Sequence, residues 1–88
     1  MRFSIISEIP GRTRLQLAGP VPESDLDALL KLGGDIDGVH KVRVYGRIGQ
    51  MALEYDESRR DAVLAAVGAL DAQVIADAKT GYVMQLEP

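Results

Sequence analysis

The chain has 88 residues, 47% of them hydrophobic and 26% charged, a formal net charge of −3 and a single histidine. Its length suits one domain, and its composition is that of an average soluble protein. Cysteine is absent, which excludes disulfide bonds, thiol catalysis and every cysteine-based metal site. No apolar run reaches the roughly 18–20 residues that cross a bilayer, so we expect a cytosolic protein or the cytosolic part of a membrane protein.

The first expected element is a strand over residues 12–17, where polar and apolar side chains alternate with a period of two. Residues 3–7 also have the composition of a strand. Pro10 and Gly11 separate the two runs. Because proline cannot donate to a sheet ladder, we expect a bulge or bend at this point.

A first helix is expected after the loop of residues 18–22. Ser24 has the position of an N-cap, and Asp27 completes an aspartate variant of the capping box. Two consecutive glycines, Gly33 and Gly34, predict the end of the helix. Its apolar stripe consists of Leu26, Leu29 and Leu30.

Two more strands are expected over residues 39–45 and 50–55, joined by a hairpin loop over residues 46–49. The alternation within residues 39–45 predicts two groups of side chains on opposite faces of the strand. One group comprises His40, Val42 and Val44, and the other comprises Lys41, Arg43 and Tyr45.

A second helix is expected to begin at Ser58, with an acidic residue, Asp61, three positions later. The segments 73–76 and 82–86 then have the composition of strands. The resulting order, βαββαβ, is typical of the ferredoxin-like arrangement. The apolar stripe of the second helix consists of Val63, Leu64, Val67 and Leu70.

The predicted fold class is therefore α+β, a ferredoxin-like sandwich with an antiparallel sheet and two helices on one face. We expect a single domain over residues 1–88, with a core over about 4–76 and an extra C-terminal strand within 77–88. The predicted core joins the apolar stripes of both helices to one face of the sheet, formed by Thr13, Leu15, Leu17, Val42, Val44, Met51, Leu53 and Tyr55.

The opposite sheet face is predicted to be open and basic. Residues 38–50 contain three cations and no acid, whereas residues 21–37, on the helix side, contain five acids and one lysine. Two interpretations remain open: a solvated face, with arginines that pair with Glu54, or a docking surface for an anionic partner. The residues of the docking interpretation are Arg12, Arg14, Lys41, Arg43 and Arg47.

Catalytic and metal-binding signals are weak. The one histidine, His40, is a candidate metal ligand together with Asp35 or Asp37, but its predicted place on the face of two valines favours a core or edge histidine. No nucleophile–base pair and no phosphate-binding glycine loop is evident. Tyr45 is the one aromatic expected on the open face, so we do not expect nucleic-acid binding, which needs stacking platforms. We expect no cofactor and no enzymatic activity.

The segment Ser7–Leu15, with its Pro-Gly-Arg-x-Arg element, is the most distinctive in the chain. It resembles the opening of the second class of heavy-metal-associated domains, found at the cytosolic N-terminus of bacterial metal-transporting P-type ATPases. Residues 38–44 resemble the strand that follows the first helix of that family, and residues 49–56 resemble its third strand with a terminal Tyr-Asp. The resemblance covers about residues 4–72.

Two departures from the family pattern concern metal binding. The loop over residues 18–24 lacks the Cys-x-x-Cys of classical heavy-metal-associated domains, and Ser7 stands where the second class often has histidine. Serine is a poor ligand for Cu(I) or Zn(II). The resemblance thus implies the fold and the transporter context without thiol chelation of a metal.

The expected function is that of a non-catalytic accessory or regulatory domain that acts by docking. Its expected partner is an acidic surface of a transporter's own domains or of another protein, with anionic lipid headgroups as a further anionic partner. The alternative is a regulatory domain of the same topology that binds a small ligand or forms a homodimer.

Overall fold

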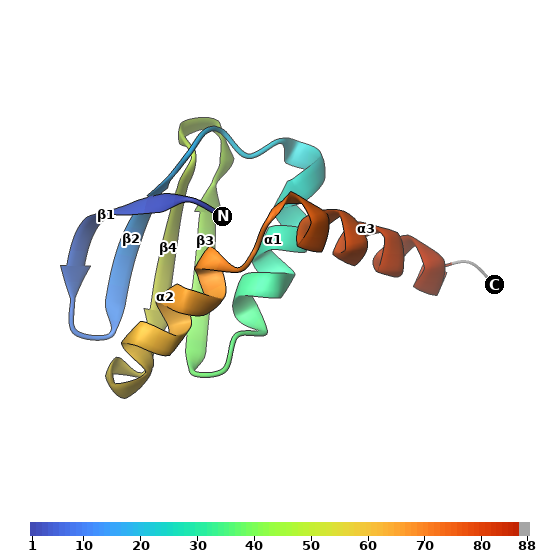
Figure 1. Ribbon diagram of the computed structural model, residues 1–88. Helices are drawn as coiled ribbons and strands as arrows, with labels where there is room; N and C mark the ends of the chain where they lie inside the picture. Colours follow the sequence, from blue (N-terminus) through green and yellow to red (C-terminus); the bar gives the residue numbers. More distant parts are fainter. Residues whose placement is uncertain (87–88) are drawn as a thin grey trace.

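The computed structural model describes the backbone of residues 1–86 and the side chains of residues 1–80. Single-turn 3₁₀ helices, η1 (Gly46–Ile48) and η2 (Glu57–Arg59), follow β3 and β4. The strands and longer helices are β1 (Phe3–Ile9), β2 (Arg12–Leu17), α1 (Glu23–Gly34), β3 (Val39–Tyr45), β4 (Gln50–Tyr55), α2 (Arg60–Gly68) and α3 (Ala72–Leu86) (Figure 1).

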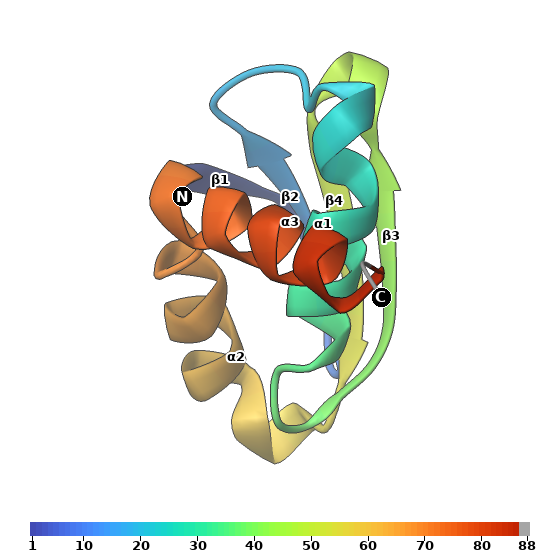
Figure 2. The same cartoon turned by 90° about the vertical axis from the view of Figure 1, so that its right-hand side faces the viewer.

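The fold is α+β, as predicted. The four strands form one antiparallel sheet in the order β1-β2-β4-β3. Helices α1 and α2 lie on the same face of this sheet, and the opposite face has no helix over it in the described chain (Figure 2). This two-layer arrangement is compatible with a ferredoxin-like sandwich, and β2 and β4 are its two central strands.

The predicted C-terminal strands over residues 73–76 and 82–86, and the extra strand placed within 77–88, are wrong as far as Leu86. Helix α3 covers this part of the chain, and residues 87–88 lie outside the described residues. The reason lies at the other end of the chain. Strand β1 pairs with β2 and so occupies the edge of β2 that β4 leaves free, where a further strand would have to pair.

The bend predicted at Pro10 and Gly11 is a tight hairpin turn. Ile9 pairs with Arg12, so the two residues between them form the whole loop. Gly11 has a φ of 78°, a conformation that side-chain-bearing residues rarely adopt. Its carbonyl accepts a hydrogen bond of 3.0 Å from the backbone N–H of Tyr55, which ties the turn to the end of β4.

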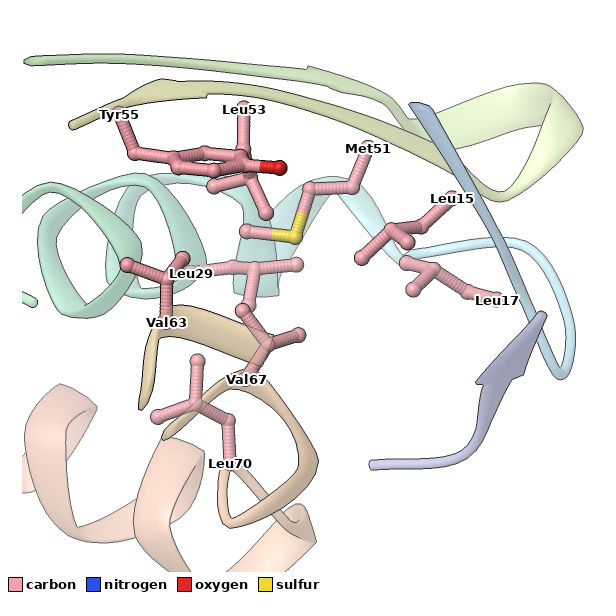
Figure 3. Packing of buried hydrophobic residues seen from close by; sticks show 9 residues of the cluster. All are labelled: Leu15, Leu17, Leu29, Met51, Leu53, Tyr55, Val63, Val67 and Leu70. Carbon is pink, nitrogen blue, oxygen red and sulfur yellow. The ribbon is translucent and has the colours of Figure 1, made fainter. Parts of the chain in front are cut away.

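The hydrophobic core lies between the sheet and the two helices, as the alternation predicts. Figure 3 shows side chains from β2 and β4 pointing toward those of α1 and α2. Leu30 departs from the prediction and is 39% exposed, whereas Val42 and Val44 are partly buried against the core. The buried hydrophobic residues are Leu15, Leu17, Leu29, Met51, Leu53, Tyr55, Val63, Val67 and Leu70.

The predicted N-caps are not the observed ones. Helix α1 begins at Glu23, so that Ser24 lies within its first turn, and no side chain caps it. Ser58 lies in η2, two residues before α2 begins. The clearest cap in the described chain is that of α3, where the carboxylate of Asp71 accepts a hydrogen bond of 2.9 Å from the N–H of Val74.

Helix α3 packs against α1 through its first half and then projects away from the sheet (Figure 1). The ammonium group of Lys79 lies 2.7 Å from the carboxylate of Asp25 on α1. Val74 and Ile75 pack against the edge of the core. No helix among residues 1–86 is long and apolar enough to cross a membrane.

Candidate functional site

The open face of the sheet contains a groove of about 570 Å³ that crosses all four strands. Its lining cations are those of the sheet face away from α1 and α2. Four cationic and two acidic side chains are among its lining residues. The groove is lined by Ile6, Ser7, Glu8, Ile9, Arg12, Thr13, Arg14, Lys41, Arg43, Tyr45, Ala52 and Glu54.

Strand register sets the positions of these side chains in rows across the sheet. Ala52 pairs with Arg14 on one side and with Arg43 on the other. With neighbouring strands about 4.8 Å apart, the Cα atoms of the two arginines are about 10 Å apart across a methyl side chain. Ser7 extends the same row onto β1. One small residue, Ala52, with a long cationic side chain on each side makes this row the hollow of the groove.

A second row contains the ion pair that the sequence left open. Glu54 pairs in register with Arg12 on β2 and with Lys41 on β3. The guanidinium group of Arg12 lies 3.5 Å from the carboxylate of Glu54, and both side chains are exposed enough for solvent to weaken the pair. Arg12 is thus partly neutralised in the groove.

Three cations in the groove have no anionic partner among the side chains of residues 1–80. Among residues 1–80, the structure records no ion pair for Arg14, Lys41 or Arg43. The guanidinium carbon of Arg14 lies 5.2 Å from the ring centroid of Tyr45, a cation–π contact that holds this side chain across the groove. The N–H groups of both arginines and the ammonium group of Lys41 are suited to bind carboxylates or phosphates.

Strand β1 forms the other wall of the groove. Ile6 and Ile9 line it, with exposed fractions of 47% and 57%. Glu8, opposite Thr13, is engaged elsewhere, because Arg60 of α2 donates hydrogen bonds to both of its carboxylate oxygens. These bonds from Arg60 are the main reason that the pKa of Glu8 lies below its ordinary value of 4.5. The Glu8 carboxylate therefore contributes little free negative charge to the groove.

The structure brings together four of the five predicted docking residues: Arg12, Arg14, Lys41 and Arg43 line the groove. Arg47 does not join them. It lies in η1, the turn between β3 and β4, and is exposed to solvent. The alternation of each strand predicted the four correctly, whereas a turn residue has no such periodic constraint.

The predicted face of His40 is wrong, although the residue lies on the edge strand β3, as one of the two expectations for it had it. Its side chain is 61% exposed and does not share the face of Val42 and Val44. The cause is a register shift between Val39 and Lys41, which inserts His40 as an extra residue in β3. The imidazole Nε2 lies 2.7 Å from the carboxylate of Asp56.

The set of metal ligands considered for His40 is not assembled. The carboxylates of Asp35 and Asp37 lie beside Lys31 and Arg59, at 3.6 and 2.9 Å respectively. Within the described part of the chain, no three histidine, aspartate or glutamate side chains gather closely enough to hold a metal ion.

The sequence patterns did not predict two parts of the groove. These are its β1 residues and Ala52, which forms its floor. A signal for β1 was available, because a Pro-Gly dipeptide between two strand-like runs is a turn signature. The register shift between Ile5 and Ser7 interrupts the alternation of β1 and hides which of its side chains share a face.

Comparison with models of protein families, with curated proteins and with solved structures finds no match for this chain. The resemblance to heavy-metal-associated domains therefore stays a prediction from the residues that carry it.

Proposed function

We propose that this chain is a non-catalytic binding domain that docks an acidic protein surface in the groove of its open sheet face. The observation that carries the proposal is the row in which Arg14 and Arg43 flank Ala52, with no anionic partner for either arginine among residues 1–80. Cations held in this way over a shallow hollow favour carboxylates presented by another protein.

The resemblance stated above fits this proposal. Pro10 and Gly11 form the turn between β1 and β2, and Arg12 and Arg14 follow it on the groove face. In a transporter of the heavy-metal-associated type, the acidic partner would be a surface of the transporter's own cytosolic domains. The proposed role is then regulation by docking, without metal chelation by thiols.

A second candidate function has one specific observation in its favour. The groove volume of about 570 Å³ lies in the range of small-molecule sites. A small anionic effector held between Arg14 and Arg43 would make the chain a ligand-binding regulatory domain. An acidic protein surface is favoured because four cations line the groove on two strands, β2 and β3, which is more than a single small anion between Arg14 and Arg43 would contact.

Calorimetric titration with a hexaglutamate peptide at low ionic strength tests the proposal. We expect saturable binding by the unmodified chain and at least a tenfold loss of affinity in the double variant Arg14→Gln, Arg43→Gln. The matched control is Arg47→Gln, which removes one exposed positive charge outside the groove. It is expected to lose less than threefold.

Parallel titrations separate the other anionic partners. Tighter binding of inorganic phosphate than of the peptide would replace the proposal by the small-ligand function. Binding to phosphatidylglycerol vesicles without binding to the peptide would replace it by lipid docking. Equal losses in the groove variant and in the Arg47→Gln control would overturn the groove as the site.

A further inference from the structure

Strand β3 is an open edge of the sheet beside the basic groove. It is last in the strand order, and no strand lies beyond it within residues 1–86. Over residues 41–45 its backbone pairs only with β4 in the described chain. Alternate N–H and C=O groups of this run therefore point outward, which is the arrangement to which an added strand binds.

The two faces of this edge differ in chemistry. Lys41 and Arg43 line the groove on the open face. Val42 and Val44 lie on the helix side, where they are half-buried and pack against the core. A strand paired with β3 would place alternate side chains beside the cations and the intervening ones beside the valines.

Charge argues against a second copy of this chain as the occupant. Antiparallel pairing of two β3 edges around Val42 would set Lys41 directly opposite Arg43 of the other copy, and pairing around Arg43 would set two arginines face to face. Like charges in directly opposed positions destabilise a sheet. The edge thus disfavours self-association and favours a strand of opposite charge.

The other free edge is less suited to strand addition. The pairing of β1 shifts register between Ile5 and Ser7, so its backbone is regular only in two short runs. In β3 the shift lies between Val39 and Lys41, which leaves residues 41–45 uninterrupted.

We propose that the acidic partner binds as an extended segment that adds a fifth strand to β3, with acidic residues at alternate positions and apolar residues between them. This inference rests on the proposed function, and it names the sequence class and the binding mode of the partner. Backbone hydrogen bonds to residues 41–45 hold the segment, and its acidic side chains reach Lys41 and Arg43.

The test compares two peptides of identical composition. In one, four glutamates alternate with three valines; in the other, the same residues stand in blocks, Glu-Glu-Val-Val-Val-Glu-Glu. We expect the alternating peptide to bind at least tenfold more tightly. It should also slow the hydrogen exchange of alternate backbone amides within residues 41–45.

Removing backbone donors from the ligand isolates the strand pairing itself. N-methylation of alternate amides on one edge of the alternating peptide keeps every side chain. It is expected to abolish the advantage over the block peptide when the methylated edge is the one that pairs with β3. Methylation of the opposite edge is expected to leave the affinity within twofold.

Variants test the position on the sheet. Lys41→Glu is expected to weaken binding of the alternating peptide at least tenfold. Arg2→Glu makes a comparable change of charge at an exposed residue that does not line the groove, and is expected to change the affinity less than threefold.

The outcomes distinguish this inference from the proposed function. Equal affinities for the two peptides, with loss of both in the Arg14→Gln, Arg43→Gln variant, would overturn strand addition and leave the docking groove supported. Absence of binding by either peptide would overturn the docking function and this inference together.

Discussion

A chain of hydrogen bonds joins the core to the edge strand at the level of single residues. The hydroxyl of Thr13, which is fully buried, donates to the carboxylate of Glu8 at 3.3 Å. It accepts a bond of 2.5 Å from the hydroxyl of Tyr55. Arg60 donates hydrogen bonds to both carboxylate oxygens of Glu8. Through Glu8, β1 is tied to β2, to β4 and to α2, so this carboxylate stabilises the wall of the groove.

The stability of the fold is predicted to depend on the ionisation of Glu8. The hydrogen bonds from Arg60 lower the pKa of Glu8 below 4.5, so the folded state favours the charged carboxylate. Its contribution to the free energy of unfolding is fully present above pH 4.5 and is lost as the pH falls through the lowered pKa. The variant Glu8→Gln lacks this contribution at every pH.

Urea unfolding of both proteins between pH 7 and pH 3 measures this difference. We expect Glu8→Gln to have the lower free energy of unfolding near neutral pH. The difference between the two proteins should disappear as the medium is acidified below pH 4.5. A difference in the free energy of unfolding that stays constant across this pH range would show that Glu8 acts through its shape and not through its charge.

At the scale of elements, local patterns predicted β2, β3, β4 and the first two helices, and they gave residues 3–7 of β1 the composition of a strand, but they did not predict α3. Residues 72–86 contain β-branched pairs that favour a strand, such as Val74 and Ile75. The same residues lie on one side of a helix that begins after the Asp71 cap and packs on α1. The packing of this segment on α1 determines that it is a helix, and a single sequence carries little information about such packing.

The close packing of α1 on the sheet depends on Gly33. This residue is buried, and a Cβ atom there would lie 2.9 Å from Cε of Met51 and 3.3 Å from both γ-carbons of Val42. The two branches of Val42 are stiff, so they cannot move aside without a shift of the helix. Gly33→Val is predicted to lower the free energy of unfolding by about 1–3 kcal/mol through overpacking.

Gly34, the next residue, is the matched control. A Cβ atom at Gly34 would meet nothing within 4 Å. Gly34→Val is therefore expected to change the free energy of unfolding by no more than about 0.5 kcal/mol. Similar losses in both variants, measured by urea unfolding, would show that the effect does not come from the contacts made at Gly33, and would contradict a packing role for this residue.

At the scale of the whole molecule, charge is separated between two sides. The groove cations lie on the open sheet face, whereas α1, on the helix side, contains exposed acidic residues that include Glu23 and Asp27. This separation steers an acidic partner toward one face of the molecule, and salt weakens the steering because exposed charges are screened.

The candidate site was predictable from the sequence where a strand is regular and unpredictable where it is not. Arg12, Arg14 and Arg43 follow from the period of two. His40 was misplaced because one inserted residue in β3 reverses the alternation on one side of it. The groove wall formed by β1 could be predicted only by knowing that β1 pairs with β2, and this pairing depends on contacts rather than on composition.

Chemical-shift mapping of backbone amides during titration with hexaglutamate tests the central claim most directly. The docking groove predicts that the largest shifts occur in β2, β3 and β4 around Arg14, Ala52 and Arg43, with α1, α2 and α3 little changed. Shifts concentrated on the helices, or spread evenly over the surface of the molecule, would contradict it.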